Sequence, residues 1–178
     1  SAKSERPNWY WRSSGVNKQY RLLLIVVAII FMITSILFNS LKQPLAIIFV
    51  IPISYIGVFL TFYWFKLNFD QGGFASFVLL CGITVNASIY IVNEYNELCK
   101  RSHLSSLRAY VKAWNIKIIP IFLTVISTIL GFIPFMVGTE KEGFWFPLAA
   151  GTIGGLIMSM IGVFILLPML TLKKKDIL

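Results

Sequence analysis

Long apolar stretches without an internal charge constrain this 178-residue chain more than any other feature of its sequence. A helix needs about 20 residues to cross the hydrocarbon core of a bilayer. A charged side chain at the centre of such a helix costs at least about 2.5 kcal/mol. Every Lys, Arg, Asp and Glu lies between the stretches or at their rims. The stretches occupy residues 22–38, 44–65, 72–92, 118–137 and 144–172.

Composition agrees with a chain that is surrounded by lipid. Hydrophobic residues make up 57% of it and charged residues only 13%, whereas an average soluble domain is about 25% charged. The stretches are apolar on all sides, while surface helices of soluble proteins keep a polar face. The sequence therefore predicts an all-α membrane protein with five transmembrane helices and one interfacial amphipathic helix. We expect the transmembrane helices at about 21–39, 44–65, 72–95, 117–137 and 144–172, and the amphipathic connector at about 100–115.

The connector between the third and fourth stretches has two different faces. Leu107, Val111 and Trp114 recur at steps of three and four residues, while Arg108 and Lys112 take the other side. This pattern is typical of a helix that lies in the membrane interface. A helix that binds a soluble partner would show the same pattern, but the spans that flank it closely favour the membrane.

The basic residues predict how the chain is oriented. Five crossings place the two ends on opposite sides, and one side collects nine Lys and Arg residues from the first hairpin loop, the 100–117 segment and the C-terminus. Apart from the N-terminal tail, the other side has only Lys66 and Lys141. Because cytoplasmic loops are enriched in basic residues, we expect the 173–178 tail in the cytoplasm and the 1–20 tail in the periplasm. The positive charges of the N-terminal tail fit this orientation if a translocated domain precedes it.

Several classes of function have little support. The net charge of +9 is scattered among loops without a basic stripe and interleaved aromatic residues, so we expect lipid headgroups and not nucleic acid as the anionic partner. His103 is the only histidine and has no Cys neighbours at ligand spacing, so we expect no metal or other cofactor. Cys81 and Cys99 would lie at opposite ends of one helix, which makes a disulfide implausible. No span carries a catalytic carboxylate pair or a nucleophile beside a base, so we expect no enzyme.

Four motifs, in the same order and at the same spacing, resemble the second membrane half of resistance-nodulation-division (RND) transporters. They are SLKQP with VIP at 40–52, GITVNASIYIVNEYN at 82–96, PIFLT with LGFIP at 120–134, and GTIGGL at 151–156. The resemblance covers about residues 20–172. It identifies the chain as the C-terminal membrane half, helices eight to twelve, of an RND efflux permease.

The resemblance implies a proton-driven efflux transporter of the bacterial inner membrane, in which this chain forms one wall of the proton relay. It also implies partners: the remaining half of the permease with an aspartate-bearing helix, a periplasmic substrate-handling domain, a homotrimeric assembly, a periplasmic adaptor and an outer-membrane channel. The alternative is a non-transporting scaffold subunit of a larger envelope complex. No acidic or basic side chain lies inside any span, so the group that carries protons must come from outside residues 1–178.

Four residues are expected beside the relay. Many drug-exporting members have a lysine at the position of Asn86, where this chain has an uncharged amide that can hydrogen-bond a carboxyl group in either protonation state. Thr84 and Ser88 flank Asn86, and Thr124 matches a threonine that the family places near the relay. Each has a structural alternative. Asn86 would contribute an interhelical hydrogen bond worth about 0.6 kcal/mol, and Thr124 a hydroxyl bonded to its own helix.

Glycine and proline positions predict how the helices pack. Gly151, Gly154 and Gly155 on the last stretch and Gly131 on the fourth are expected at helix contacts, because small residues let two backbones approach closely. Pro52 inside the second stretch is expected to kink that helix, since its ring removes a backbone hydrogen bond. These residues predict packing and do not by themselves indicate transport.

Overall fold

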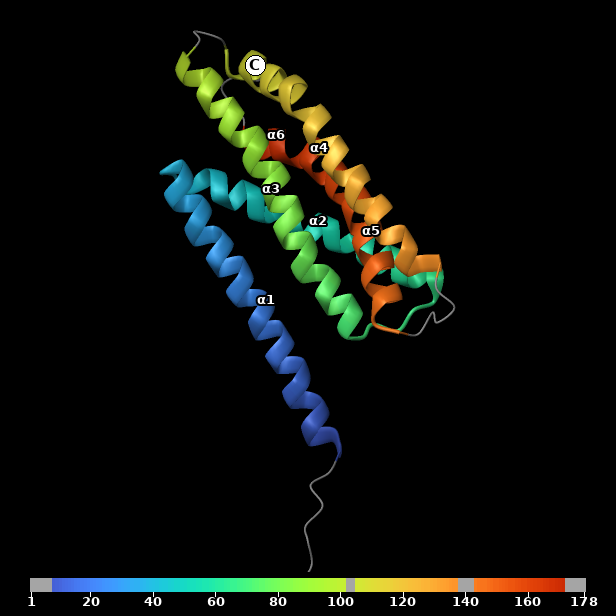
Figure 1. The fold of residues 1–178 in the computed structure, drawn as a ribbon. Coiled ribbons are helices and arrows are strands. Elements are labelled where there is room, and N and C mark those ends of the chain that lie inside the picture. Colours follow the sequence, from blue (N-terminus) through green and yellow to red (C-terminus); the bar gives the residue numbers. More distant parts are fainter. Residues whose placement is uncertain (1–7, 102–104, 138–142, 172–178) are drawn as a thin grey trace, which may run out of the picture.

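The structure is a bundle of long helices (Figure 1). The computed structural model describes residues 8–101, 105–137 and 143–171. Within these residues all regular elements are helical, and five helices are long and apolar enough to cross a membrane. The predicted all-α membrane fold is therefore confirmed. The basic tail at 173–178 and His103 lie outside the described residues.

Short connections join consecutive helices, which makes them antiparallel neighbours. The first helix begins at Asn8, thirteen residues before the predicted start at residue 21. No proline interrupts the segment between these two positions, so the helix of the first span continues in the N-terminal direction. The elements are α1 (Asn8–Phe38), α2 (Lys42–Phe65), α3 (Gln71–Arg101), α4 (Ser106–Val137), α5 (Trp145–Ile161), the π-helical turn η1 (Gly162–Leu166) and α6 (Leu167–Thr171).

Residues 106–115 of the amphipathic stretch are helical, and they form the first turns of α4 instead of a separate helix. No glycine or proline separates it from the fourth apolar stretch, so nothing in the local sequence ends the helix between them. One face packs on the bundle: Ala109 and Ala113 are fully buried, and the rings of Trp114 and Phe164 lie 4.3 Å apart between centroids. Leu107 and Val111 of the predicted apolar face are exposed, so the bundle covers only part of that face.

The last span changes its winding near its C-terminal end. α5 passes into η1 and α6, and the N–H of Leu167 bonds to the carbonyl of Gly162, five residues earlier. Pro168 follows directly. Because proline has no N–H to donate and its ring clashes with the preceding turn, regular α-helical bonding is interrupted here. The predicted helix at 144–172 is thus one span, from Trp145 to Thr171, that contains a π-helical turn.

α5 is the central helix, since it packs against α2, α3 and α4. In Figure 1, α3 and α4 run side by side, and α1 packs on α2 and α3 with its N-terminal end extending beyond the other helices. Half of the span residues of α3 are buried inside the structure (50%), but only 11% of those of α4. The other described helices therefore leave most of the span of α4 uncovered.

Candidate functional site

A groove of about 360 Å³ between α3 and α4 contains two of the predicted residues. Asn86 of α3 and Thr124 of α4 both line it. They are far apart in the sequence, so the packing of α4 on α3 is what brings them together. The other residues that line the groove are Ile83, Ala87, Tyr90, Pro120, Ile121, Val125 and Thr128.

This groove lies at the middle of the spans. Asn86 is the central residue of α3, which runs from Gln71 to Arg101. A helix of 31 residues is about 46 Å long at about 1.5 Å per residue, and the hydrocarbon core is about 30 Å thick. Thr124 is likewise near the middle of α4. Asn86 and Thr124 also lie inside the apolar stretches 72–92 and 118–137, so the polar groups of the groove lie at the depth of the hydrocarbon core.

The groove combines apolar walls with a few uncharged polar groups, and none of the described residues that line it is charged. Thr124 donates to the Ile121 carbonyl at 2.8 Å, and Thr128 donates to the Thr124 carbonyl at 2.7 Å. Both threonine protons are thus used within α4. Asn86 and Tyr90 are exposed, and their side chains form no hydrogen bond within the described part of the chain. The free donors of the groove are the Asn86 amide and the Tyr90 hydroxyl.

The other two predicted relay neighbours lie on the opposite face of α3. Residues two positions apart in a helix are separated by about 200°, and Thr84 and Ser88 are buried whereas Asn86 between them is exposed. Ser88 donates to the Thr84 carbonyl at 2.9 Å. The Thr84 hydroxyl is buried and has no hydrogen-bond partner among the described residues. The structure therefore separates Thr84 and Ser88 from the groove.

Tyr90 and Pro120 also line the groove, although neither was selected from the sequence. Tyr90 lies four residues after Asn86, and Pro120 lies four residues before Thr124. Positions four apart share one face of a helix. Helix periodicity would therefore have predicted both residues in the groove, once it was known that Asn86 and Thr124 face each other.

The predicted packing glycines fall into two groups. A Cβ atom on Gly151 would lie 2.7 Å from the Ser76 hydroxyl oxygen, and a Cβ atom on Gly154 or Gly155 would overlap a side chain of α2 or α3. These three positions of α5 are where a side chain would push the helices apart. Gly131 of α4, in contrast, meets nothing within 4 Å in the described structure.

Pro52 lies inside α2 and is exposed. Its missing N–H leaves the Ile48 carbonyl without its usual partner in the helix. α2 nevertheless continues as a helix on both sides of the proline. The expected kink stays a prediction.

Sequence comparison identifies the relatives of this chain. A family model described as the AcrB/AcrD/AcrF family matches residues 10–173. Proteins named multidrug resistance protein MdtC from Citrobacter koseri, Escherichia coli and Shigella sonnei are each 26% identical to this chain over 147 residues. These matches cover 82% of this chain but only 14% of each relative. Because the family model spans most of the sequence, the chain belongs to the AcrB/AcrD/AcrF family, and the RND relationship predicted from its motifs is confirmed.

Proposed function

We propose that this chain forms part of the membrane domain of a proton-driven efflux transporter, and that the groove between α3 and α4 is its side of the proton relay. The observation that carries this proposal is the meeting of Asn86 and Thr124 in one uncharged groove at the middle of the spans. The relatives are named multidrug resistance proteins, which supports export of small molecules as the activity.

The chemistry of the groove suits an incoming carboxyl group. The Asn86 amide and the Tyr90 hydroxyl are donors without a partner in the described part of the chain. If a neighbouring helix covered them without supplying acceptors, each buried, unsatisfied group would cost about 1–3 kcal/mol. A carboxylate accepts from both donors, and a protonated carboxyl can donate to the Asn86 amide oxygen. The RND resemblance implies such a carboxyl group on the aspartate-bearing helix of the other half.

Protonation of that carboxyl group would change how strongly the two halves attract each other. Hydrogen bonds to a charged group contribute about 1.5–3 kcal/mol, against about 0.5–1.5 kcal/mol for neutral pairs. Binding of a proton would therefore weaken the attraction of the aspartate helix to the groove, and release would restore it. We propose that this cycle shifts α3 and α4 relative to that helix and that the shift is passed to the periplasmic domain.

Asn86 makes this relay different from one with a lysine at the same position. An amide is neutral and meets a carboxylate as a dipole, whereas a lysine meets it as a charge. The attraction between the two halves would then depend less on ionic interactions and more on hydrogen-bond geometry. We expect the positions of Tyr90 and Thr124 to matter correspondingly more.

The proposal places the chain in the bacterial inner membrane with its N-terminal end in the periplasm and its C-terminal end in the cytoplasm. Five helices of spanning length and the uneven distribution of basic residues support it. The chain spans only 14% of the length of the relatives that it matches. The other half of the permease, a homotrimeric assembly, a periplasmic adaptor and an outer-membrane channel are therefore proposed partners.

The test compares two Asn-to-Leu variants of α3 in the complete transporter, reconstituted in liposomes with an imposed pH gradient. Asn86→Leu is expected to reduce gradient-driven dye efflux at least about tenfold, a loss of ~1.4 kcal/mol in coupling, while thermal unfolding in detergent is unchanged. Asn96→Leu is the matched control, because it removes an amide that hydrogen-bonds Gln43 of α2. It is expected to lower thermal stability while efflux still follows the gradient.

Two results would contradict the proposal. Efflux by the Asn86→Leu variant with the wild-type dependence on pH would show that Asn86 only packs against its neighbours. A complete wild-type protein that exports no dye under any gradient would favour the scaffold alternative.

A further inference from the structure

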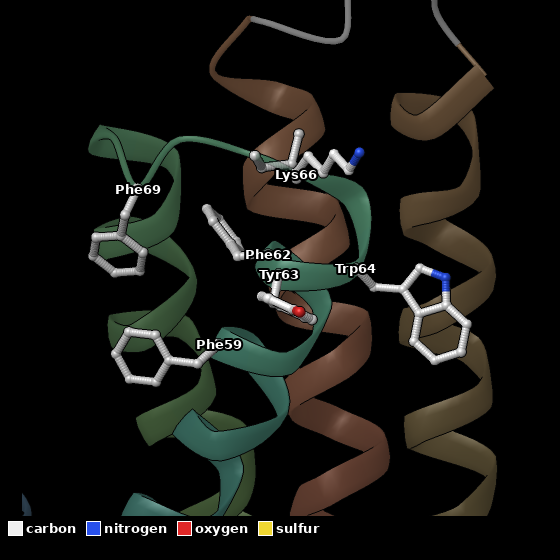
Figure 2. Close-up of a pocket in the computed structure, with 7 residues that line it drawn as sticks. Phe59, Phe62, Tyr63, Trp64, Lys66 and Phe69 are labelled. Carbon is white, nitrogen blue, oxygen red and sulfur yellow. The ribbon is translucent and has the colours of Figure 1, made fainter.

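The end of α2 carries an aromatic pocket with a lysine at its rim (Figure 2). The pocket has a volume of about 650 Å³ and lies where α2 meets the loop to α3. Five aromatic side chains, Leu67 and Lys66 line it. It shares no lining residue with the α3–α4 groove. It is therefore a separate feature that the proposed relay does not use.

Ring packing holds three of the five aromatic side chains of this pocket in place. Phe69 of the loop stacks on Phe59 with 5.7 Å between ring centroids, and it lies 5.4 Å from the ring of Phe62. Figure 2 shows these three rings gathered on the same side of the pocket. The Asp70 carboxylate accepts a hydrogen bond from the Gly72 backbone at 2.9 Å, which holds the loop where α3 begins. The pocket is thus formed without a ligand, as is usual for small-molecule sites.

The pocket lies at the depth of the lipid headgroups. α2 has 24 residues and is about 36 Å long, slightly more than the hydrocarbon thickness of about 30 Å. Tyr63 and Trp64 in its last turn are 85% and 80% exposed, and such amphipathic rings are favoured at the membrane–water interface. Lys66 is the first residue after the end of α2. Its ammonium group is therefore placed where lipid phosphates are found.

Lys66 is a cation in a backbone conformation that lysine rarely adopts. Its φ of 53° is left-handed, and its N–H bonds to carbonyls in the last turn of α2. Glycine usually takes this position after a helix, because a side chain is strained there. Lys66 forms no ion pair within the described part of the chain. A cation without an ion pair among the described residues, placed beside an aromatic pocket, suits a negatively charged ligand.

We propose that this pocket binds an anionic phospholipid of the surrounding bilayer. Lys66 pairs with the headgroup phosphate, and the first part of an acyl chain lies against the rings of Phe59 and Tyr63. In a zwitterionic lipid the phosphate is balanced by the choline or amine of the same molecule. A cation that forms no ion pair with the described residues therefore favours a headgroup with a net negative charge. In the expected orientation of the chain, this lipid belongs to the periplasmic leaflet.

The test uses the complete transporter in nanodiscs of phosphatidylglycerol and phosphatidylcholine. Native mass spectrometry counts the lipids that stay bound after transfer into detergent. Lys66→Gln is expected to lower the retained ratio of phosphatidylglycerol to phosphatidylcholine about fivefold, the effect of one cation at a membrane surface. Lys66→Arg keeps the charge and is expected to keep the ratio. Lys42→Gln, an equal loss of charge at the exposed opposite end of α2, is expected to lower the ratio clearly less than Lys66→Gln.

Several results would overturn the proposal. Equal losses in the Lys66→Gln and Lys42→Gln variants would indicate diffuse attraction to the whole surface. An unchanged lipid ratio together with lower thermal stability would show that Lys66 only interacts with the helix dipole.

If the Lys66→Gln variant does not fold, Tyr63→Ala provides the second test, because this ring is exposed. It is expected to reduce retention of phosphatidylglycerol, and unchanged retention contradicts the site. Lipid counts do not depend on transport, so the result is independent of the proposed function.

Discussion

A Cβ atom on Gly57 of α2 would overlap the carbonyl oxygen of Gly154 on α5. The two helices cross at this point with backbone against backbone, within the most extensive helix contact of the bundle. The obstacle is main chain, which cannot move aside as the flexible end of a side chain can. Small residues at the crossing are therefore a condition for the packing of these two helices.

Replacement of Gly57 by alanine is expected to destabilise the bundle by about 1–3 kcal/mol, the usual cost of overpacking. Thermal unfolding of the purified protein in detergent measures the change. Gly131→Ala is the matched control, because Gly131 meets nothing within 4 Å in the described structure. Alanine also favours a helix over glycine by up to about 1 kcal/mol. Equal stability of the two variants would mean that the crossing tolerates a side chain.

The spans could be predicted from the sequence because the thickness of the bilayer fixes their length. The second helix was expected at 44–65 and is found at Lys42–Phe65. The start of α1 and the continuity of α4 were not predicted. The hydropathy pattern shows where a segment leaves the hydrocarbon core. A helix can continue beyond that point and ends only where a residue or a contact stops it. The boundaries outside the membrane therefore depend on local chain preferences and not on hydropathy.

The candidate site was predicted only in part. The resemblance selected Asn86 and Thr124, which line one groove. Thr84 and Ser88 were selected as the polar neighbours of Asn86, and the packing of α3 turns them inward. Helix periodicity shows which residues share a face, and it does not show which neighbour that face meets. Gly131 illustrates the same limit, since a glycine permits close approach only where another helix is present. Contacts between helices had to come from the structure.

The side-chain amides of Gln43 and Asn96 hydrogen-bond each other twice, at 2.7 and 2.8 Å, and so join α2 to α3. Loss of one amide leaves the other half-buried and unpaired. We expect Gln43→Leu alone to lower the free energy of unfolding by about 1 kcal/mol, in the range measured for hydrogen bonds in membrane proteins. The Gln43→Leu/Asn96→Leu double variant should lose less than the sum of the two single variants. Thermal unfolding in a double-mutant cycle measures this coupling, and strictly additive losses would show that the amides act independently.

Two ion pairs near the C-terminal end of α3 should differ in their contribution to stability. The Lys117–Glu94 pair has an N–O distance of 3.0 Å, joins α4 to α3, and its side chains are 32% and 17% exposed. The Arg101–Glu97 pair lies within α3, with exposed fractions of 77% and 47%. Exposed pairs contribute about 0–1 kcal/mol, whereas an unpaired charge left by removal of a buried partner costs up to about 3–5 kcal/mol.

Lys117→Met is therefore expected to cost about 1–2 kcal/mol, between those limits, and Arg101→Met less than about 0.5 kcal/mol. Thermal unfolding in detergent at low and high salt is the measurement. Salt screens exposed charges more than buried ones, so the effect of Arg101→Met should disappear at high salt while that of Lys117→Met persists. A larger loss for Arg101→Met would contradict the difference in burial.

Lys66→Gly should make the chain more stable, although it removes the charge at the rim of the aromatic pocket. Lys66 has a φ of 53°, and glycine adopts this conformation without steric cost. Relief of the backbone strain stabilises the folded chain, while the lost interaction with the helix dipole and the greater freedom of glycine in the unfolded chain act against it. The net gain in the free energy of unfolding is about 0.5–1 kcal/mol. Thermal unfolding in detergent measures it, with Lys66→Gln as the control that loses the charge but keeps the strained Cβ. Because the glycine variant separates backbone strain from charge, it should unfold at a higher temperature than the glutamine variant while both lose the preference for anionic lipid. A glycine variant that is less stable than the glutamine variant would show that the left-handed backbone at this position is not strained.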